Sequence, residues 1–415
     1  MKPSIAPRAG SVHGRQRGFT LIELMVALAV GLVLTLAITG TVLTMGRQFR
    51  IVGSNAAAQG SAQIALSLID RAGRSAGAGM FSGGQLLCTT LNAWNNGATK
   101  SNDAVFLPVR IIDGGTDKLS DTIVFSGSNA AGSLGVMPLM DSMANAGADV
   151  LVSRGGSIKN GDVALIGAPG SGQPCTLFQV TAAPTDLAGL ASCGNNATAC
   201  QSLQRAGNDV TGYNPTTPAT AFANPVKYGF VTPSVPPVYG PAAVSRMGTD
   251  FVQQAFKVKC GALLQYNAFL GDPTGGCTEN PLSFPAGVSA LATDVVLMHA
   301  QYGLSNTGAD DAVTSWVDAT GLTWTAPTAL NGGRIKAVRV VIVVRSREPG
   351  TGDVTAASCT NEAGIVNNGP CSFSDAQTPV IDLRDVAVPA GRNWKNYSYR
   401  VHQAVIPLRN VIWNN

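Results

Sequence analysis

Charged side chains are scarce in this chain. Asp, Glu, Lys and Arg make up only 13% of its 415 residues, and histidine occurs three times. Glycine, by contrast, is abundant, with 48 residues, and Asn, Ser and Thr are frequent between the apolar runs. Few charges together with many turn-forming residues predict a loop-rich, β-rich body.

An excess of positive charge is confined to the N-terminus. The net charge is +4, and residues 1–18 contain four basic residues and no acidic one, so the remainder is formally neutral. A neutral body lacks the clustered Lys and Arg that bind phosphates, which argues against nucleic acid as a partner. Lys336, Arg339, Arg345 and Arg347 are close in sequence, and we expect them to form the solvated face of a strand.

Motifs of common catalytic and cofactor sites are absent: there is no phosphate loop, no H-E-x-x-H and no dinucleotide motif. Residues 73–77 fit G-x-S-x-G around Ser75, but a helical pattern precedes the serine and a loop follows, whereas a nucleophile elbow needs a strand and then a helix. His13 lies near the N-terminus, and His299 and His402 lie in expected strands, where a structural role is expected. We therefore expect no catalytic residue and no cofactor.

The sequence has eight cysteines, none of them in C-x-x-C spacing, which argues against a zinc ribbon or a thioredoxin-type site. An even number in a chain with an export segment predicts disulfides, although eight cysteines allow about a hundred connectivities. Proximity in sequence favours Cys193–Cys200, Cys260–Cys277 and Cys359–Cys371, which leaves Cys88–Cys175.

Only one apolar run is long enough to cross a membrane. Phe19 to Met45 contains a single charged residue, Glu23. As a helix this run would be about 40 Å long, enough to span a bilayer. No basic residue lies between Arg17 and Arg47, so the positive-inside rule places the N-terminus in the cytoplasm and the rest of the chain outside.

Two ordinary interpretations of this run compete. A cleaved secretory signal would need a small-x-small site after the apolar core, and residues 37–41 match that poorly. A simple single-pass anchor needs no cleavage. Neither explains the carboxylate of Glu23, because an isolated acid in hydrocarbon costs about 3 kcal/mol and is retained for a function.

The local sequence RGFTLIELMV, residues 17–26, resembles the prepilin processing motif, in which a basic leader ends in Gly. The resemblance implies cleavage between Gly18 and Phe19 by a membrane-embedded prepilin peptidase, followed by N-methylation of Phe19. Glu23 would then pair with the positive amine of Phe19 in a neighbouring subunit. The leader, residues 1–18, is long for this class, so Met1 need not be the true start.

The helix is expected to continue beyond the membrane. Ala65, Ile69, Ala72 and Ala76 recur at three- and four-residue spacing, with Leu68 beside them, and form one apolar stripe. Glycines from residue 77 onward end the pattern. We expect an N-terminal pilin helix within 19–79, reaching about residue 75, of which 19–45 is transmembrane.

Residues 80–415 are expected to form a large antiparallel β-rich body, which makes the fold class α+β. Short apolar runs separated by turn residues predict strands at 104–112, 122–125, 149–153, 163–166, 176–180, 255–259, 295–302, 335–345 and 399–407. Residues 206–249, rich in Pro, Thr and Ala, are expected to be an irregular loop or a linker that divides the body into two lobes.

Phrases along the body resemble minor pilins of the PilW type. They lie at residues 65–77, 120–125, 161–166, 175–181, 301–303, 316–319, 335–340, 344–346 and 399–410. In many relatives the loop after the Tyr-Gly strand is Asp-rich and able to hold calcium. Here residues 304–311 keep only Asp310 and Asp311, so no metal is expected.

The resemblance implies a minor pilin, a non-enzymatic structural subunit needed for type IV pilus assembly or priming near the pilus tip, and thus for adhesion and motility. It implies a single-pass protein of the bacterial inner membrane with its body in the periplasm, later assembled into the pilus. Implied partners are the prepilin peptidase, other minor pilins and the major pilin, with a tip adhesin and the inner-membrane assembly platform as further candidates.

Two alternatives remain open at this point. A J-type minor pseudopilin of a type II secretion system shares the leader and the architecture, and the sequence does not separate the two. A membrane-anchored extracellular enzyme is disfavoured, because Ser75 lacks the required local context.

Overall fold

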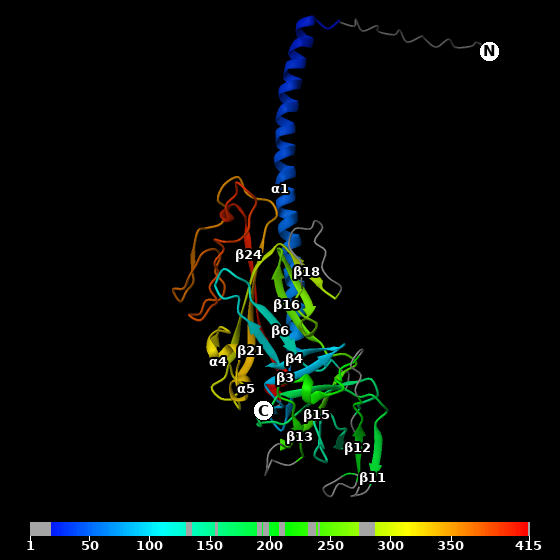
Figure 1. Cartoon of the computed structure of the whole chain (residues 1–415). Helices are drawn as coiled ribbons and strands as arrows, with labels where there is room; N and C mark the ends of the chain where they lie inside the picture. The colour runs from blue at the N-terminus through cyan, green and yellow to red at the C-terminus, as the bar shows by residue number, and fades with distance from the viewer. Residues whose placement is uncertain are drawn as a thin grey trace, which may run out of the picture. The chain divides into compact units, whose positions relative to one another are not determined.

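The computed structural model describes residues 18–129, 135–153, 157–188, 193, 199–206, 212–230, 238–239, 241–273 and 287–413. The chain divides into two compact units, residues 1–53 and 54–415. Helix α1 (Leu21–Ser75) belongs to both: its first part lies in the N-terminal unit, and the part after Gly53 lies in the strand-rich second unit, the body. Figure 1 draws α1 in blue and the strands of the body in cyan to red.

Three sheets make up most of the described body. The first has the order β4 (Ala98–Val105), β3 (Thr90–Asn95), β10 (Cys175–Gln179), β9 (Val163–Gly167), β15 (Ala243–Gly248), β7 (Val136–Pro138). The second has the order β18 (Ser289–Thr293), β17 (Ala262–Asn267), β16 (Gln253–Lys259), β6 (Thr122–Ser126), β5 (Val109–Ile112). The third has the order β20 (Ser315–Val317), β19 (Val295–Leu304), β21 (Ile335–Arg345), β24 (Tyr399–Pro407).

Smaller elements complete the described body. A three-stranded sheet joins β11 (Thr185–Ala188), β12 (Ala199–Leu203) and β8 (Val150–Ser153). Two-stranded pairs are β1 (Phe81–Ser82) with β2 (Gln85–Leu86), β13 (Lys227–Tyr228) with β14 (Val238–Tyr239), and β22 (Cys359–Thr360) with β23 (Val366–Asn367). Short helices are α3 (Pro218–Ala221), η1 (Ala268–Leu270), α4 (Gly321–Thr325), α5 (Ala329–Gly333), η2 (Trp394–Asn396) and α6 (Arg409–Trp413).

The predicted fold class is confirmed: an N-terminal apolar helix precedes a strand-rich body with antiparallel sheets. Among the named strands only β3 with β10 and β13 with β14 pair in parallel. The strands expected at 335–345 and 399–407 are β21 and β24, with the same bounds.

Two expected segments differ from the structure. The strand expected over 104–112 is split, because Phe106, Leu107 and Pro108 separate β4 from β5, which lie in different sheets. Pro108 has no amide hydrogen for a ladder, so a break here is favoured. The segment 206–249 is not a linker in its described residues: it contains β15, which pairs with both β9 and β7 inside the first sheet.

Strand β21 separates two hydrophobic cores, because alternate residues of a strand point to opposite faces. Val338, Val340 and Ile342 belong to the main core, whereas Val341 and Val343 pack with Ile381, Leu383, Tyr397 and Tyr399. The stretch between β21 and β24 therefore covers the second face of this sheet. A strand buried on both faces reads as the continuous apolar run seen here.

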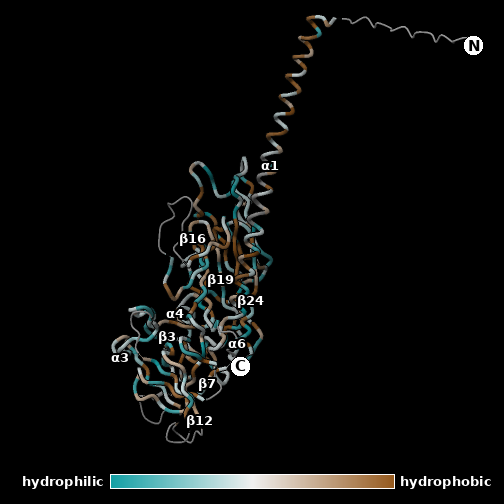
Figure 2. Tube along the Cα trace, turned by 90° about the vertical axis from the view of Figure 1, so that its right-hand side faces the viewer, coloured by the Kyte–Doolittle hydropathy of each residue, from teal (hydrophilic) through white to brown (hydrophobic). Residues whose placement is uncertain are grey.

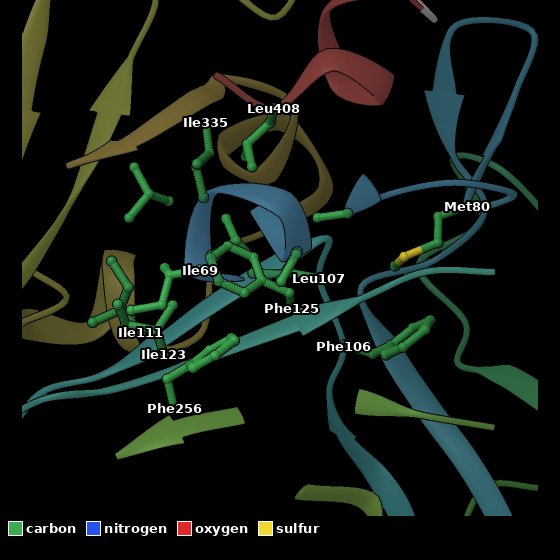
Figure 3. Close-up of a cluster of buried hydrophobic side chains, with 14 of the residues drawn as sticks. Ile69, Met80, Phe106, Leu107, Ile111, Ile123, Phe125, Phe256, Ile335 and Leu408 are labelled. Carbon is green, nitrogen blue, oxygen red and sulfur yellow. The ribbon is translucent and has the colours of Figure 1, made fainter. Parts of the chain in front are cut away.

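The buried stripe of α1 packs into the main core. Of the predicted stripe, Ala65, Ile69, Ala72 and Ala76 are buried and Leu68 is half-buried; Ala62 is buried as well. Figure 3 shows Ile69 among side chains of β5 and β6, including Ile111, Ile123 and Phe125. Small residues bring the helix close to the sheets: a Cβ on Gly73 would lie 2.5 Å from Cγ2 of Ile406.

Candidate functional site

The first turn of α1 contains a capping box built on Thr20 and Glu23. The amide and the hydroxyl of Thr20 donate to Oε2 of Glu23, at 3.3 and 3.2 Å. In return the Glu23 amide donates to the Thr20 hydroxyl at 3.3 Å. This reciprocal pattern satisfies helix N-terminal donors that would otherwise lack a partner. Sequence reasoning overlooked it, although the Thr-x-x-Glu spacing before an apolar run is its signature.

The proposed cleavage position is accessible in the N-terminal unit. Phe19 is 86% exposed, and a Cβ added to Gly18 would meet nothing within 4 Å. Both residues precede Leu21, the first residue of α1, so a protease would not need to unwind the helix to reach the bond between them. The basic residues expected in the leader, and His13, lie outside the described residues.

The segment Leu21–Gly46 is one helix, long and apolar enough to cross a membrane, with a mean hydropathy of 2.6. None of it is buried inside the described protein. Figure 2 shows this first half of α1 predominantly brown, the hydrophobic colour. The hydroxyls of Thr35, Thr39, Thr41 and Thr44 donate to carbonyls four residues earlier, at 2.7–3.0 Å. Its polar side chains are thereby satisfied within the helix, which an apolar environment demands.

The other end of α1 is held by the C-terminal residues of the body. Nδ2 of Asn410, in α6, donates to the carbonyl oxygens of Ser75 and Ala76 at 3.2 and 3.1 Å, and is 3.5 Å from that of Arg74. These carbonyl groups lie at the end of α1, where no amide of the helix remains to donate to them. We call this contact the Asn410 clasp.

A buried arginine organises the second face of the third sheet. Arg339, on β21, is 1% exposed and lies 4.8 Å from the ring centroids of both Trp316 and Phe373. Its Nη1 donates to Asp375 at 2.6 Å and its Nε to Gln301 at 2.6 Å. Through Asp375 and Phe373, Arg339 ties the disulfide-bearing stretch after β21 to the sheet.

The expectation that the basic cluster 336–347 forms a solvated face was therefore wrong for its first two members. Lys336 is fully buried, and its ammonium donates to the carbonyl of Gly308 at 2.7 Å. Arg347 is exposed, as expected. The signal that could have found the buried pair is a charge inside an otherwise apolar, β-branched run, which marks a strand buried on both faces.

In the loop 304–311, Asp310 bonds within the loop itself. Asp310 accepts hydrogen bonds from the amide and the hydroxyl of Thr307, at 3.0 and 2.9 Å. The Lys336 ammonium also binds this loop, because it donates to the carbonyl oxygen of Gly308. Within the described ranges, no group of three or more His, Cys, Asp or Glu side chains is arranged to hold a metal ion.

The residues of the G-x-S-x-G pattern lie at a helix end. Ser75 is the last residue of α1, and its hydroxyl donates to the Ala72 carbonyl at 2.9 Å. His299, in β19, is held elsewhere, with Nδ1 3.4 Å from Asp121 and Nε2 3.1 Å from the Asp117 carbonyl. The helix-then-turn geometry is that of a C-terminus, not of a nucleophile elbow.

Three disulfides join described cysteines: Cys88–Cys175, Cys193–Cys200 and Cys359–Cys371. Cys193–Cys200 and Cys359–Cys371 are pairs that proximity in sequence favours, and Cys88–Cys175 is the pair that this assignment leaves over. The predicted partner of Cys260, Cys277, lies outside the described residues, so that pair stays a prediction.

Comparison with known proteins bears on both ends of the chain. Residues 13–39 match the model of the prokaryotic N-terminal methylation motif, and residues 284–410 match that of the type IV pilus-assembly protein W. No curated protein and no solved structure matches the chain. The second match runs from just before β18 to the Asn410 clasp and includes Arg339.

An apolar helix behind a Gly-Phe junction, with an acid five residues into the apolar run and a methylation-motif match, defines a prepilin-type protein. With the match over residues 284–410, the two family models support a pilin of the PilW type, related to type IV pilus assembly. Both families consist of structural pilus components, which interact with other pilus components and with the prepilin peptidase.

Proposed function

We propose that the chain is a minor pilin: a structural, non-enzymatic subunit that primes or completes assembly of a type IV pilus near its tip. The observation that carries the proposal is the combination, in one chain, of the N-terminal methylation motif and the PilW-type body. The PilW match also favours a pilus over a type II secretion pseudopilus.

Before assembly, the protein would sit in the bacterial inner membrane through Leu21–Gly46, with residues 54–415 in the periplasm. Two observations support this orientation. Basic residues precede the apolar helix, and none follows until Arg47. The body also contains disulfides, which form and persist in oxidising compartments.

Processing would release residues 1–18 and give Phe19 a methylated amine. Other minor pilins and the major pilin would then pack on the exposed apolar surface of Leu21–Gly46. The tip adhesin and the inner-membrane platform are further candidate partners, in keeping with roles in adhesion and motility.

Mass spectrometry of the N-terminus, on protein recovered from membranes or sheared filaments, tests the processing step. We expect a mature chain that begins with N-methylated Phe19, and no cleavage in Gly18→Val, because a branched side chain obstructs an extended chain in a narrow protease site. Gly352→Val, at an exposed glycine of the body where an added Cβ would meet nothing within 4 Å, serves as the processing control. An intact leader, or a first residue near position 40, would contradict the proposal.

Glu23 has two candidate roles, the capping box and a charge pair with the Phe19 amine of a neighbouring subunit. Thr20→Val removes the hydroxyl of the capping box but keeps the carboxylate, whereas Glu23→Gln keeps a capping side chain but removes the charge. If the charge pair drives assembly, Glu23→Gln should reduce surface pili at least tenfold, with Thr20→Val close to wild type.

Pilus counts by electron microscopy, with cleavage checked in each variant, decide between these roles. Equal defects in both variants would assign Glu23 to helix capping. Normal pilus numbers in Glu23→Gln would remove the charge pair from the proposal.

A further inference from the structure

A pocket of about 320 Å³ lies where the chain leaves β12, outside both the methylation motif and the PilW match. Its lining includes Gly147, Asp149, Gln204, Arg205, Thr216 and Pro218. These residues come from the connections before β8, after β12 and before α3, and the strands β11 and β12 locate the region in Figure 1. Nothing in the assembly role described above uses this pocket.

Arg205 is the unusual member of the lining. The residue is only 4% exposed, and its guanidinium carbon lies 5.0 Å from the ring centroid of Phe178. Among the described residues, none accepts a hydrogen bond from its Nε or Nη1, and both atoms are buried. Asp149 bonds to the main chain instead: its Oδ1 accepts from the Arg205 amide at 3.2 Å.

The guanidinium keeps its charge in this setting. Burial lowers the pKa of Arg205 to about 10, with the nearby Tyr228 and Asp149 opposing the change, so the group is still cationic at neutral pH. A buried cation whose N–H donors lack acceptors is costly, and an oxyanion is the partner that satisfies charge and donors together.

We propose that Arg205 and the pocket around it bind a small oxyanion group, a carboxylate or a phosphate. Phe178 covers one face of the guanidinium, which leaves its N–H edges for recognition. Because Nε and Nη1 are buried, the oxyanion would have to pass the lining of the pocket to reach them. Asp149 lines the same pocket and repels a second negative charge, which favours a singly charged carboxylate over a dianionic phosphate. The pocket has room for more than an isolated ion, so the group would belong to a larger molecule.

Thermal unfolding of the full-length protein in detergent tests the site. Sodium acetate and sodium phosphate are compared with sodium chloride at equal ionic strength, for wild type, Arg205→Met and the control Arg400→Met, an exposed arginine on β24. We expect a saturable rise in Tm, on the order of 3 °C at about a hundred times Kd, in wild type and Arg400→Met but not in Arg205→Met.

In chloride alone, Arg205→Met should be at least as stable as wild type, because it replaces an unsatisfied buried charge by an apolar chain of similar length. A response to acetate only would identify a carboxylate site, and one to phosphate only a phosphate site. No saturable response in wild type, or an equal response in Arg205→Met, would overturn the proposal.

If Arg205→Met fails to fold, Arg205→Lys and calorimetric titration of wild type with acetate and phosphate decide. Absence of saturable binding to wild type refutes the site.

Discussion

His299 and Asp121 connect the loop before β6 to the middle of β19. Besides the imidazole, Asp121 accepts the Ala300 amide at 2.8 Å and the Gly114 amide at 3.0 Å. Burial alone would lower the pKa of His299, but Asp121 and the Asp117 carbonyl outweigh it, so that the pKa is raised above 6.5. The folded protein therefore binds this proton more tightly than the unfolded chain.

A histidine with a raised pKa makes stability depend on pH in a defined direction. Its contribution is complete below the unfolded value of about 6.5 and is lost as pH rises through the folded value. We expect the free energy of unfolding of wild type to fall across this window, and His299→Gln to remove that fall, in urea titrations of the detergent-solubilised protein.

His402 provides the control for this prediction. Burial lowers its pKa, so its contribution is present above 6.5 and is lost as pH decreases below that value. His402→Gln should therefore leave the decline above pH 6.5 intact. A decline that survives in His299→Gln would show that another group is responsible.

Single residues were the hardest to predict from sequence. The processing motif is local, so Gly18, Phe19 and Glu23 can be recognised from their neighbours in the chain. Arg339 cannot, because Trp316, Phe373 and Asp375 reach it only after the sheet and the stretch beyond it have folded. The same holds for Arg205, whose burial depends on segments far apart in sequence.

At the scale of elements, α1 combines two environments in one helix. Up to Gly46 its large apolar side chains are exposed, while beyond residue 61 a stripe of mostly small residues is buried in the body. The buried stripe of the second half could be predicted from the periodicity of the sequence, because only one face of that half packs against the sheets. The first half, apolar all round, is typical of a helix that packs in a membrane or among other helices.

Two isoleucines of α1 allow this division to be tested. Ile69 is fully buried in the main core, whereas Ile64 is 60% exposed. Ile69→Ala should lower the free energy of unfolding of the body by about 3 kcal/mol, because it leaves a cavity, and Ile64→Ala by no more than about 0.5 kcal/mol. Denaturant unfolding monitored by tryptophan fluorescence measures both, and similar losses would contradict the packing of α1.

Among the strands, the long apolar runs were predictable and the boundaries between sheets were not. β21 and β24 follow directly from their β-branched runs. β15 was missed because the residues before it are rich in proline, and its position between β9 and β7 depends on pairing with strands about 80 and 107 residues earlier in the chain.

For the whole molecule, the disulfides close loops of very different length. Cys88–Cys175 spans 87 residues and joins the start of the body to β10, while Cys359–Cys371 spans 12. A longer loop loses more chain entropy in the unfolded state when it is closed. Replacing both cysteines by alanine should therefore cost about 4.5 kcal/mol for Cys88–Cys175 and about 3 kcal/mol for Cys359–Cys371.

Urea unfolding of the two double-alanine variants in detergent measures these costs. The shorter loop lies in the stretch that covers the second face of β21, so its variant should keep the main core intact. A larger loss for Cys359–Cys371 would show that local packing, and not loop entropy, governs the stability of this fold.

The Asn410 clasp also orders events during synthesis. Residues 21–75 leave the ribosome early, yet the side chain that closes the end of α1 lies 335 residues after Ser75. Contacts so far apart in sequence form late, because the intervening chain must first be arranged. If Leu21–Gly46 enters the bilayer as it is made, it is committed there long before its own body can secure it, and a chain that stops before Asn410 would be inserted but never closed.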